Sequence, residues 1–374
     1  GTLFFDAAGG PWTGLMILTY MFALMGIQSA PAFSMWAFAN RDPSPFPWQQ
    51  VVASSIIIGG ILFFFTAIQG LGVRLLDMEL IPGTKPLGLP SSDYLVPYLI
   101  DTLATSSPIL LGLLAVCALA AMQSTGAAYM STASGIITRD LYRHFFNKEA
   151  SNAAQIFVGR LSVAIVVTMA LLVGLASGDL LVLLGGLAVS YGFQMWPALL
   201  GICYIRFFTP QGIVCGLIAG LIAVTFTYIT ELGGLIGIGR YPLTLHSAGW
   251  GILFNLGTVV LVSLFSQSKN SEALSHRDRY HDFLKEHTAL PEHKKKWKRP
   301  AWILTIVWFL CAIGPFAVLG NESDPALWPF GIPTLWVWQI VWWIIGCIMM
   351  YLLAFKLEMS TVPERKIEPL AQEA

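Results

Sequence analysis

The sequence predicts an all-α integral membrane protein. Hydrophobic residues make up 56% of the 374 residues and charged residues only 11%, whereas a soluble protein carries about a quarter charged residues. Apolar segments long enough to cross a bilayer as helices recur along the whole chain. The five cysteines all fall inside these segments, which indicates small core residues rather than a disulfide framework.

About nine segments are long enough to span the bilayer. They cover residues 12–38, 51–73, 108–137, 158–176, 180–204, 212–229, 249–265, 301–319 and 335–355. An odd number of spans places the two ends of the chain on opposite sides. With the N-terminal end outside, 18 of the 21 Lys and Arg residues fall inside. The positive-inside rule therefore predicts a cytoplasmic C-terminus in the plasma or inner membrane.

The first span is predicted to be interrupted. Gly26, Gln28, Ser29 and Pro31 lie together at mid-depth, where Gly and Pro weaken a helix and free backbone groups. Breaks of this kind form ligand contacts in secondary transporters. A proline kink relieved by a neighbouring helix is the alternative explanation.

The third span has hydroxyl groups at its centre. Ala121, Ser124 and Thr125 are three and four residues apart and so share one helix face. The Thr125 side chain can lie beside the Ala121 carbonyl, which gives three uncharged oxygens that suit a hard monovalent cation. Back-bonding to the helix, or close helix packing, is the ordinary role of such residues in lipid.

The fifth and sixth spans are also patterned. The fifth contains Ser190, Tyr191 and Gln194 and is predicted to be kinked and partly polar, although helix packing explains this composition as well. In the sixth, glycines recur every fourth residue from 212 to 220, which is typical of a helix-packing face.

The middles of the spans contain no Asp, Glu, Lys, Arg or His. A carboxylate or histidine proton relay is therefore not expected in this chain. The spans also lack a nucleophile–base–acid set, so an enzyme is not expected. The net charge of zero gives no reason to expect a nucleic-acid partner.

The run from Ala121 to Tyr142 resembles the sodium-site helix of the sodium:solute symporter family. In that family a Ser-Ser or Ser-Thr pair precedes the Asp of a terminal Asp-x-Tyr motif by sixteen and fifteen residues, and Ser124 and Thr125 stand at these distances from Asp140. The resemblance implies a leucine-transporter-like inverted-repeat fold. It implies a sodium ion bound by the Ala121 carbonyl, Ser124 and Thr125. By position it also implies a substrate site that contains Gln28, Ser29, Pro31, Ser190, Tyr191 and Gln194.

The same resemblance divides the chain. Residues 1–206 would be the second five-helix repeat, 207–267 peripheral spans, 268–299 a cytoplasmic linker, 300–356 a C-terminal helix pair and 357–374 a cytoplasmic tail. The first five core helices of the family are absent from the sequence. A second chain or an N-terminal segment would have to supply them, since a lone repeat cannot enclose a midplane site.

The function expected from the resemblance is sodium-coupled symport of a small organic solute, either a monocarboxylate or an amino acid. The lipid bilayer, the solute and sodium are the expected partners. The alternative is a symporter-like sensor or a structural subunit of a membrane complex, which the C-terminal helix pair and the absent helices leave open.

Overall fold

A computed structural model describes most of the chain. The described residues are 13–40, 42–67, 97–98, 100–101, 107–176, 181–229, 240–267, 271–317, 319, 322 and 324–361. They fall into two compact units, one within residues 1–58 and 182–374 and the other within residues 59–181.

The described residues are helical, with no extended strand among them. Among the described residues, seven helices are long and apolar enough to cross a membrane, and the bent pair of α1 (Gly14–Ser29) and α2 (Pro31–Ala39) makes an eighth. The predicted all-α membrane class is therefore confirmed. The predicted span at 301–319 is shorter than expected: α16 (Lys298–Trp308) continues through the five residues of η6 (Phe309–Ile313), and the helix then ends. Gly314 and Pro315 follow, and proline has no N–H to continue a helix.

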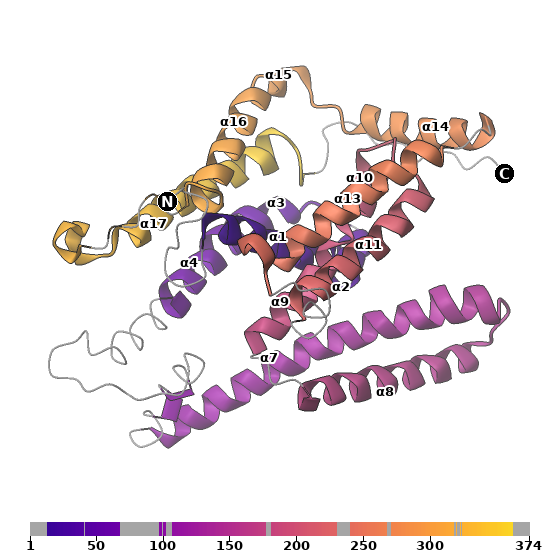
Figure 1. Cartoon of the computed structure of the whole chain (residues 1–374), viewed down its shortest axis with the longest axis horizontal. Helices are drawn as coiled ribbons and strands as arrows, with labels where there is room; N and C mark the ends of the chain where they lie inside the picture. Colours follow the sequence, from indigo (N-terminus) through magenta and orange to yellow (C-terminus); the bar gives the residue numbers. More distant parts are fainter. Residues whose placement is uncertain are drawn as a thin grey trace. The chain divides into compact units, whose positions relative to one another are not determined.

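The unit within residues 59–181 is built around a helical hairpin (Figure 1). α7 (Pro108–Gly135), extended by η4 (Ile136–Phe146), runs antiparallel to α8 (Asn152–Ala176). The helices are in tight contact at Gly159, because a methyl group there would lie 3.1 Å from the Ser134 hydroxyl oxygen. Ser134 donates a hydrogen bond to the Gly159 carbonyl at 3.0 Å, which joins the two helices at this point.

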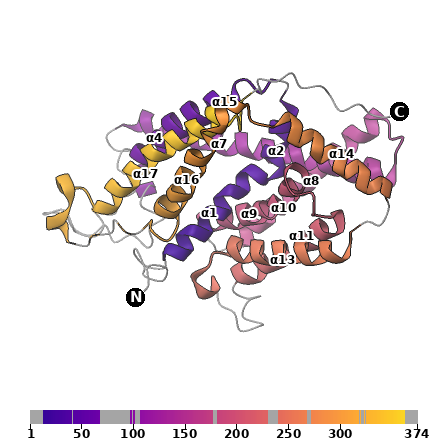
Figure 2. The same cartoon turned by 90° about the horizontal axis from the view of Figure 1, so that it is seen from above.

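In the other unit, α11 (Pro210–Tyr228) and α13 (Ser247–Phe265) lie side by side (Figure 2). The three glycines of α11 are buried against α13, and a methyl group at Gly216 would lie 2.3 Å from a Val259 side-chain carbon. The predicted helix-packing face is therefore confirmed. Its physical basis is that glycine lets two backbones approach closely.

The polar segment predicted as a linker contains helices in the structure. α14 (Ser271–His287) and α15 (Glu292–Lys295) occupy most of it. Acidic and basic residues alternate along α14, and such pairs stabilise a solvent-exposed helix.

The C-terminal helices form a pair within the same unit. α17 (Thr334–Tyr351) packs against α16 and η6. Two indole N–H groups hold the pair together: Trp308 donates to the Trp342 carbonyl at 2.8 Å, and Trp338 donates to the Cys311 carbonyl at 3.0 Å. These bonds satisfy the polar edges of large apolar side chains.

Candidate functional site

The first span is broken where the sequence predicts it. α1 (Gly14–Ser29) and α2 (Pro31–Ala39) are separated by Ala30, which has an extended backbone. The angle between the segments Gly14–Ser29 and Pro31–Ala37 is 55°. Pro31 occupies the first position of α2, where its missing N–H costs nothing. Ala30 still donates its N–H to the Gly26 carbonyl at 2.9 Å.

The end of α1 is in backbone contact with α9 (Leu181–Phe193). A methyl group at Gly26 would lie 1.8 Å from the Val189 carbonyl oxygen, and one at Gly192 would lie 2.6 Å from the Gly26 carbonyl oxygen. Ser29, which is buried, donates its hydroxyl to the Gly192 carbonyl at 2.7 Å. Two glycines and one serine therefore join the helix break to α9.

The candidate residues of α9 are also bonded inside the protein. Ser190 donates to the Gly186 carbonyl at 2.6 Å, and the Tyr191 hydroxyl lies 2.7 Å from that of Thr225. Of the two candidates on the first span that flank Ser29, Gln28 is exposed and Pro31 is partly exposed. Substrate contact by these residues remains a prediction; what the structure adds is that Ser29 and Ser190 already have protein partners.

Gln194 lies at the end of α9 in a buried amide pair. Its backbone carbonyl and its side-chain carbonyl both accept from Asn255 Nδ2, at 2.8 and 3.2 Å. The Gln194 amide nitrogen donates to the Ser190 carbonyl at 3.1 Å. Gly220 and Gly251 leave room for this pair. A methyl group at Gly220 would lie 2.4 Å from Gln194 Oε1, and one at Gly251 would lie 2.5 Å from Gln194 Nε2. Sequence reasoning missed Asn255, whose one signal is a lone carboxamide inside an apolar span.

The candidate sodium-binding residues lie near the middle of α7. Ser124 donates its hydroxyl to the Ala121 carbonyl at 2.9 Å, so the carbonyl expected beside Thr125 accepts from Ser124. Ala121, Ser124 and Thr125 are all exposed on the described structure. The lone pairs of Ser124 stay available, because the hydroxyl acts as a donor in this bond. One helix face supplies three oxygens at most, whereas a hard cation such as calcium takes roughly six or more.

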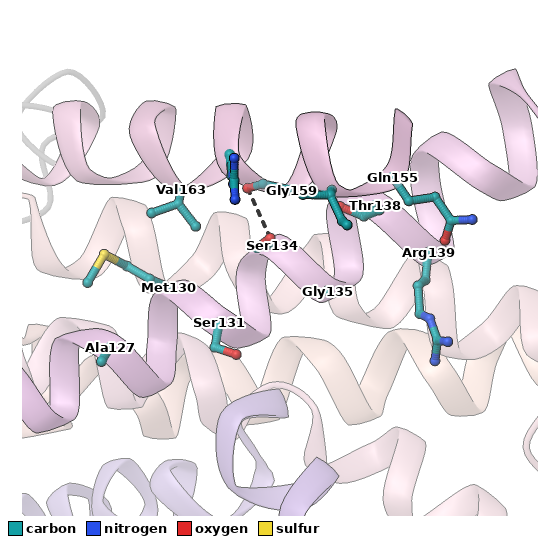
Figure 3. Close-up of a pocket in the computed structure, with 12 residues that line it drawn as sticks. Ala127, Met130, Ser131, Ser134, Gly135, Thr138, Arg139, Gln155, Gly159 and Val163 are labelled. Atoms are coloured by element: carbon teal, nitrogen blue, oxygen red, sulfur yellow. Dashed lines mark hydrogen bonds between the residues drawn. The ribbon is translucent and has the colours of Figure 1, made fainter. Parts of the chain in front are cut away.

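Figure 3 shows a cavity of about 670 Å³ further along the same helix, between α7, η4 and α8. Hydroxyl groups of Ser131, Ser134 and Thr138 line it, together with Arg139 and Arg160. The Thr138 hydroxyl is buried without a hydrogen-bond partner among the described residues. The labelled side chains in Figure 3 show Arg139 pointing away from α8, so the cavity has no cluster of converging cations.

The buried His246 lies where α1 meets α13. It is the N-cap of α13, its backbone N–H donates to Thr19 Oγ1 at 2.8 Å, and its Nδ1 accepts from the Ala248 N–H. The Tyr20 and Tyr241 rings flank the imidazole, and Nε2 has no partner among the described residues. Burial, and then the nearby Arg240, lower its pKa from 6.5 to about 4.

Lowering the pH from 6.5 towards 4 should therefore destabilise the protein. In this window the unfolded state binds a proton at this histidine and the folded state does not, so the free energy of unfolding falls as the pH falls. His246→Asn, which keeps an N-cap, should flatten the decrease. Thermal unfolding in detergent at several pH values measures both proteins, and an equal decrease in the two would contradict the assignment.

The described part of the chain is thus a multi-spanning α-helical membrane protein with one broken span and one hydroxyl-bearing span. Residues 48–220 match the model of the Sodium:solute symporter family. This segment contains α7, so the resemblance seen in the Ser124–Thr125 and Asp140-Leu141-Tyr142 motif is confirmed.

Several curated relatives are named as transporters or symporters rather than enzymes. The chain is 30% identical over 132 residues to the osmoregulated proline transporter OpuE of Bacillus subtilis, which is 35% of the chain and 27% of the relative. It is 25% identical over 180 residues to the high-affinity proline transporter PutP of the same organism, covering 48% of the chain and 36% of the relative. It is 28% identical over 143 residues to a sodium/proline symporter of Staphylococcus aureus, covering 35% of the chain and 28% of the relative.

The chain therefore spans only about a quarter to a third of the length of these relatives. No solved structure matches it. The names of these three relatives refer to proline, and none refers to a monocarboxylate.

Proposed function

We propose that this protein takes part in sodium-coupled symport of a small organic solute, with proline as the first solute to test. The observation that carries the proposal is the match of residues 48–220 to the Sodium:solute symporter family, because this segment includes the helix with the hydroxyl pair. The named sodium/proline symporter supports both the ion and the solute.

In this proposal the coupling ion contacts the Ala121 carbonyl, Ser124 and Thr125. Two of these oxygens are already 2.9 Å apart, which is a suitable separation for two ligands of one cation. Neutral oxygens fit a sodium ion better than a proton, since none of them titrates near neutral pH. The remaining ligands would come from other helices.

The solute would bind beside the helix break, with Gln28, Ser29 and Pro31 on one side and Ser190, Tyr191 and Gln194 on the other. Extended backbone at Ala30 supports this placement, because a broken helix presents N–H and C=O groups to a ligand. Gln28 is the exposed member of the set and so the one whose side chain is open to a solute. We further propose that the start of α1 faces outside. A cytoplasmic C-terminus requires an odd number of spans, so in this proposal α16 and η6 cross the membrane as a ninth span in addition to the eight that are long and apolar enough among the described residues.

Thr125→Ala should reduce sodium-driven uptake of labelled proline by about tenfold, the effect of losing roughly 1.4 kcal/mol of ion binding. Uptake into proteoliposomes that contain the full-length protein measures it, with an inward sodium gradient. Thr168→Ala is the matched control, because Thr168 is an exposed threonine of α8 whose hydroxyl is bonded to its own helix at Ala164. That control should transport normally.

Two results would reject the proposal. One is proline uptake that does not depend on the sodium gradient in the wild-type protein. The other is an equal effect of Thr125→Ala and Thr168→Ala. Absence of uptake for any small solute would favour the alternative of a sensor or a structural subunit.

A further inference from the structure

A second cavity, of about 740 Å³, lies beside α14, and none of the candidate sodium or substrate residues lines it. Its walls come from the last turns of α10 (Trp196–Cys203), the first turns of α11 and one face of α14. The candidate spans Leu184–Cys203 and Pro210–Tyr228 end and begin here, so the cavity lies at one membrane interface. By the positive-inside assignment this interface is the cytoplasmic one.

The part of the cavity nearest the spans is mainly apolar, although Thr209, Gln211 and Ser266 also line it. Ala198, Ile202, Phe208, Ile213 and Val214 line it, and Ile202 and Val214 are about half exposed. Aliphatic side chains in this arrangement suit a hydrocarbon chain, because they offer no polar group that needs a partner.

The part formed by α14 is polar and cationic. Leu274, Arg277 and His281 recur at helical spacing and Tyr280 lies beside them, so these residues share one face. No carboxylate is among the described residues that line the cavity. Arg277, Tyr280 and His281 thus line the cavity, and no acidic residue of α14 does.

The aspartates of α14 do not line the cavity, and their main partner is Arg206, which does not line it either. Asp282 forms an ion pair with Arg206, and Asp278 Oδ1 lies 3.6 Å from Arg206 Nε. Asp278 also lies 3.8 Å from Arg277 Nε, which leaves the two terminal nitrogens of Arg277 for other partners. One of them, Nη1, donates to Gln267 Oε1 at 3.1 Å.

Gln267 fixes the position of Arg277. Its amide nitrogen donates to the carbonyls of Ser263 and Phe207, at 2.7 and 2.9 Å. Its oxygen therefore faces Arg277. Arg277 is held over the cavity by a residue anchored at the end of α13, and the guanidinium keeps N–H groups that can bind a second acceptor.

We propose that this cavity binds an anionic phospholipid of the adjacent leaflet. The phosphate lies at Arg277, with His281 and Tyr280 beside it, and an acyl chain lies along Ile202, Ile213 and Val214. Cationic pockets between helices at the cytoplasmic interface are suited to anionic headgroups. A free anion would need only the arginine, whereas a phospholipid would also use the apolar side chains of the cavity for its acyl chain. The presence of both in one cavity favours a lipid.

Native mass spectrometry of the full-length protein, released from detergent micelles, tests the proposal. Dioleoyl phosphatidylglycerol is the probe, and phosphatidylcholine with the same chains is the reference. We expect one phosphatidylglycerol to be retained about fivefold more than phosphatidylcholine, which is the effect of one arginine near a lipid surface, about 1 kcal/mol. Arg277→Gln should abolish this preference, and Arg277→Lys should retain part of it.

Lys285→Gln is the matched control. It removes one positive charge from the same helix at an exposed position that does not line the cavity, and it should retain the preference. Inorganic phosphate in excess should leave phosphatidylglycerol bound. Equal retention of the two lipids by the wild-type protein, equal loss in Arg277→Gln and Lys285→Gln, or displacement by inorganic phosphate would each overturn the proposal.

Discussion

Gly26→Ala should destabilise the protein more than alanine at any other glycine of the described helices. The added carbon would lie 1.8 Å from the Val189 carbonyl oxygen and 2.7 Å from the Phe193 backbone nitrogen. Both neighbours are backbone atoms, so no rotamer change can relieve the overlap. Overpacking typically costs about 1–3 kcal/mol, and contact with a fixed backbone places this variant at the upper end of that range.

Thermal unfolding followed by tryptophan fluorescence in detergent measures this effect, as a shift in unfolding temperature. Gly185→Ala is the matched control, since it adds the same methyl group to α9 at a position with no neighbouring atom within 4 Å. We expect the control to be neutral or slightly stabilising, because alanine favours helix over glycine by up to about 1 kcal/mol. Similar unfolding temperatures for the two variants would show that α1 and α9 are not in backbone contact.

Asn255→Ala should destabilise the protein by about 1–3 kcal/mol, because it leaves buried acceptors without a donor. Asn255 Nδ2 donates to both the backbone carbonyl and the side-chain carbonyl of Gln194. Both residues are about 1% exposed, so water cannot replace the lost bonds. Gln123→Ala is the control, since it removes an exposed carboxamide from another span.

A double-mutant cycle separates the amide pair from simple loss of volume. If the two side chains interact as described, Gln194→Ala combined with Asn255→Ala should cost less than the sum of the single variants, by about 0.5–3 kcal/mol. The same unfolding measurement serves for all four proteins. Additive effects would mean that the two carboxamides do not stabilise one another.

The features that the sequence predicts well are those in which one local pattern determines the outcome. Glycines at every fourth residue predict the contact of α11 with α13, and Pro31 after Gly26 predicts the broken first span. Each depends on steric rules that act within a few residues. The motif from Ser124 to Tyr142 likewise depends on the spacing of a few residues on one helix, and it lies in the segment that matches the family model.

The features that the sequence does not predict depend on partners far along the chain. Ser29 donates a hydrogen bond to Gly192, and Gln194 accepts one from Asn255. The sequence around Ser29 or Gln194 does not indicate which distant residue will be its partner. The helicity of α14 escapes prediction for another reason: a segment without an apolar face resembles a linker, although its alternating charges stabilise a helix. Polar groups inside spans suggest ligand contacts, and the structure gives Ser29, Ser190 and Gln194 protein partners.

The contact between Gly26 and Gly192 also determines where the first span can flex. At this point the two helices touch through bare backbone, so no side chain can adjust there, and sliding would require the helices to separate first. We therefore expect α1 and α9 to move as one body. A change in the angle between α1 and α2 would take place at Ala30, the residue of extended backbone between them.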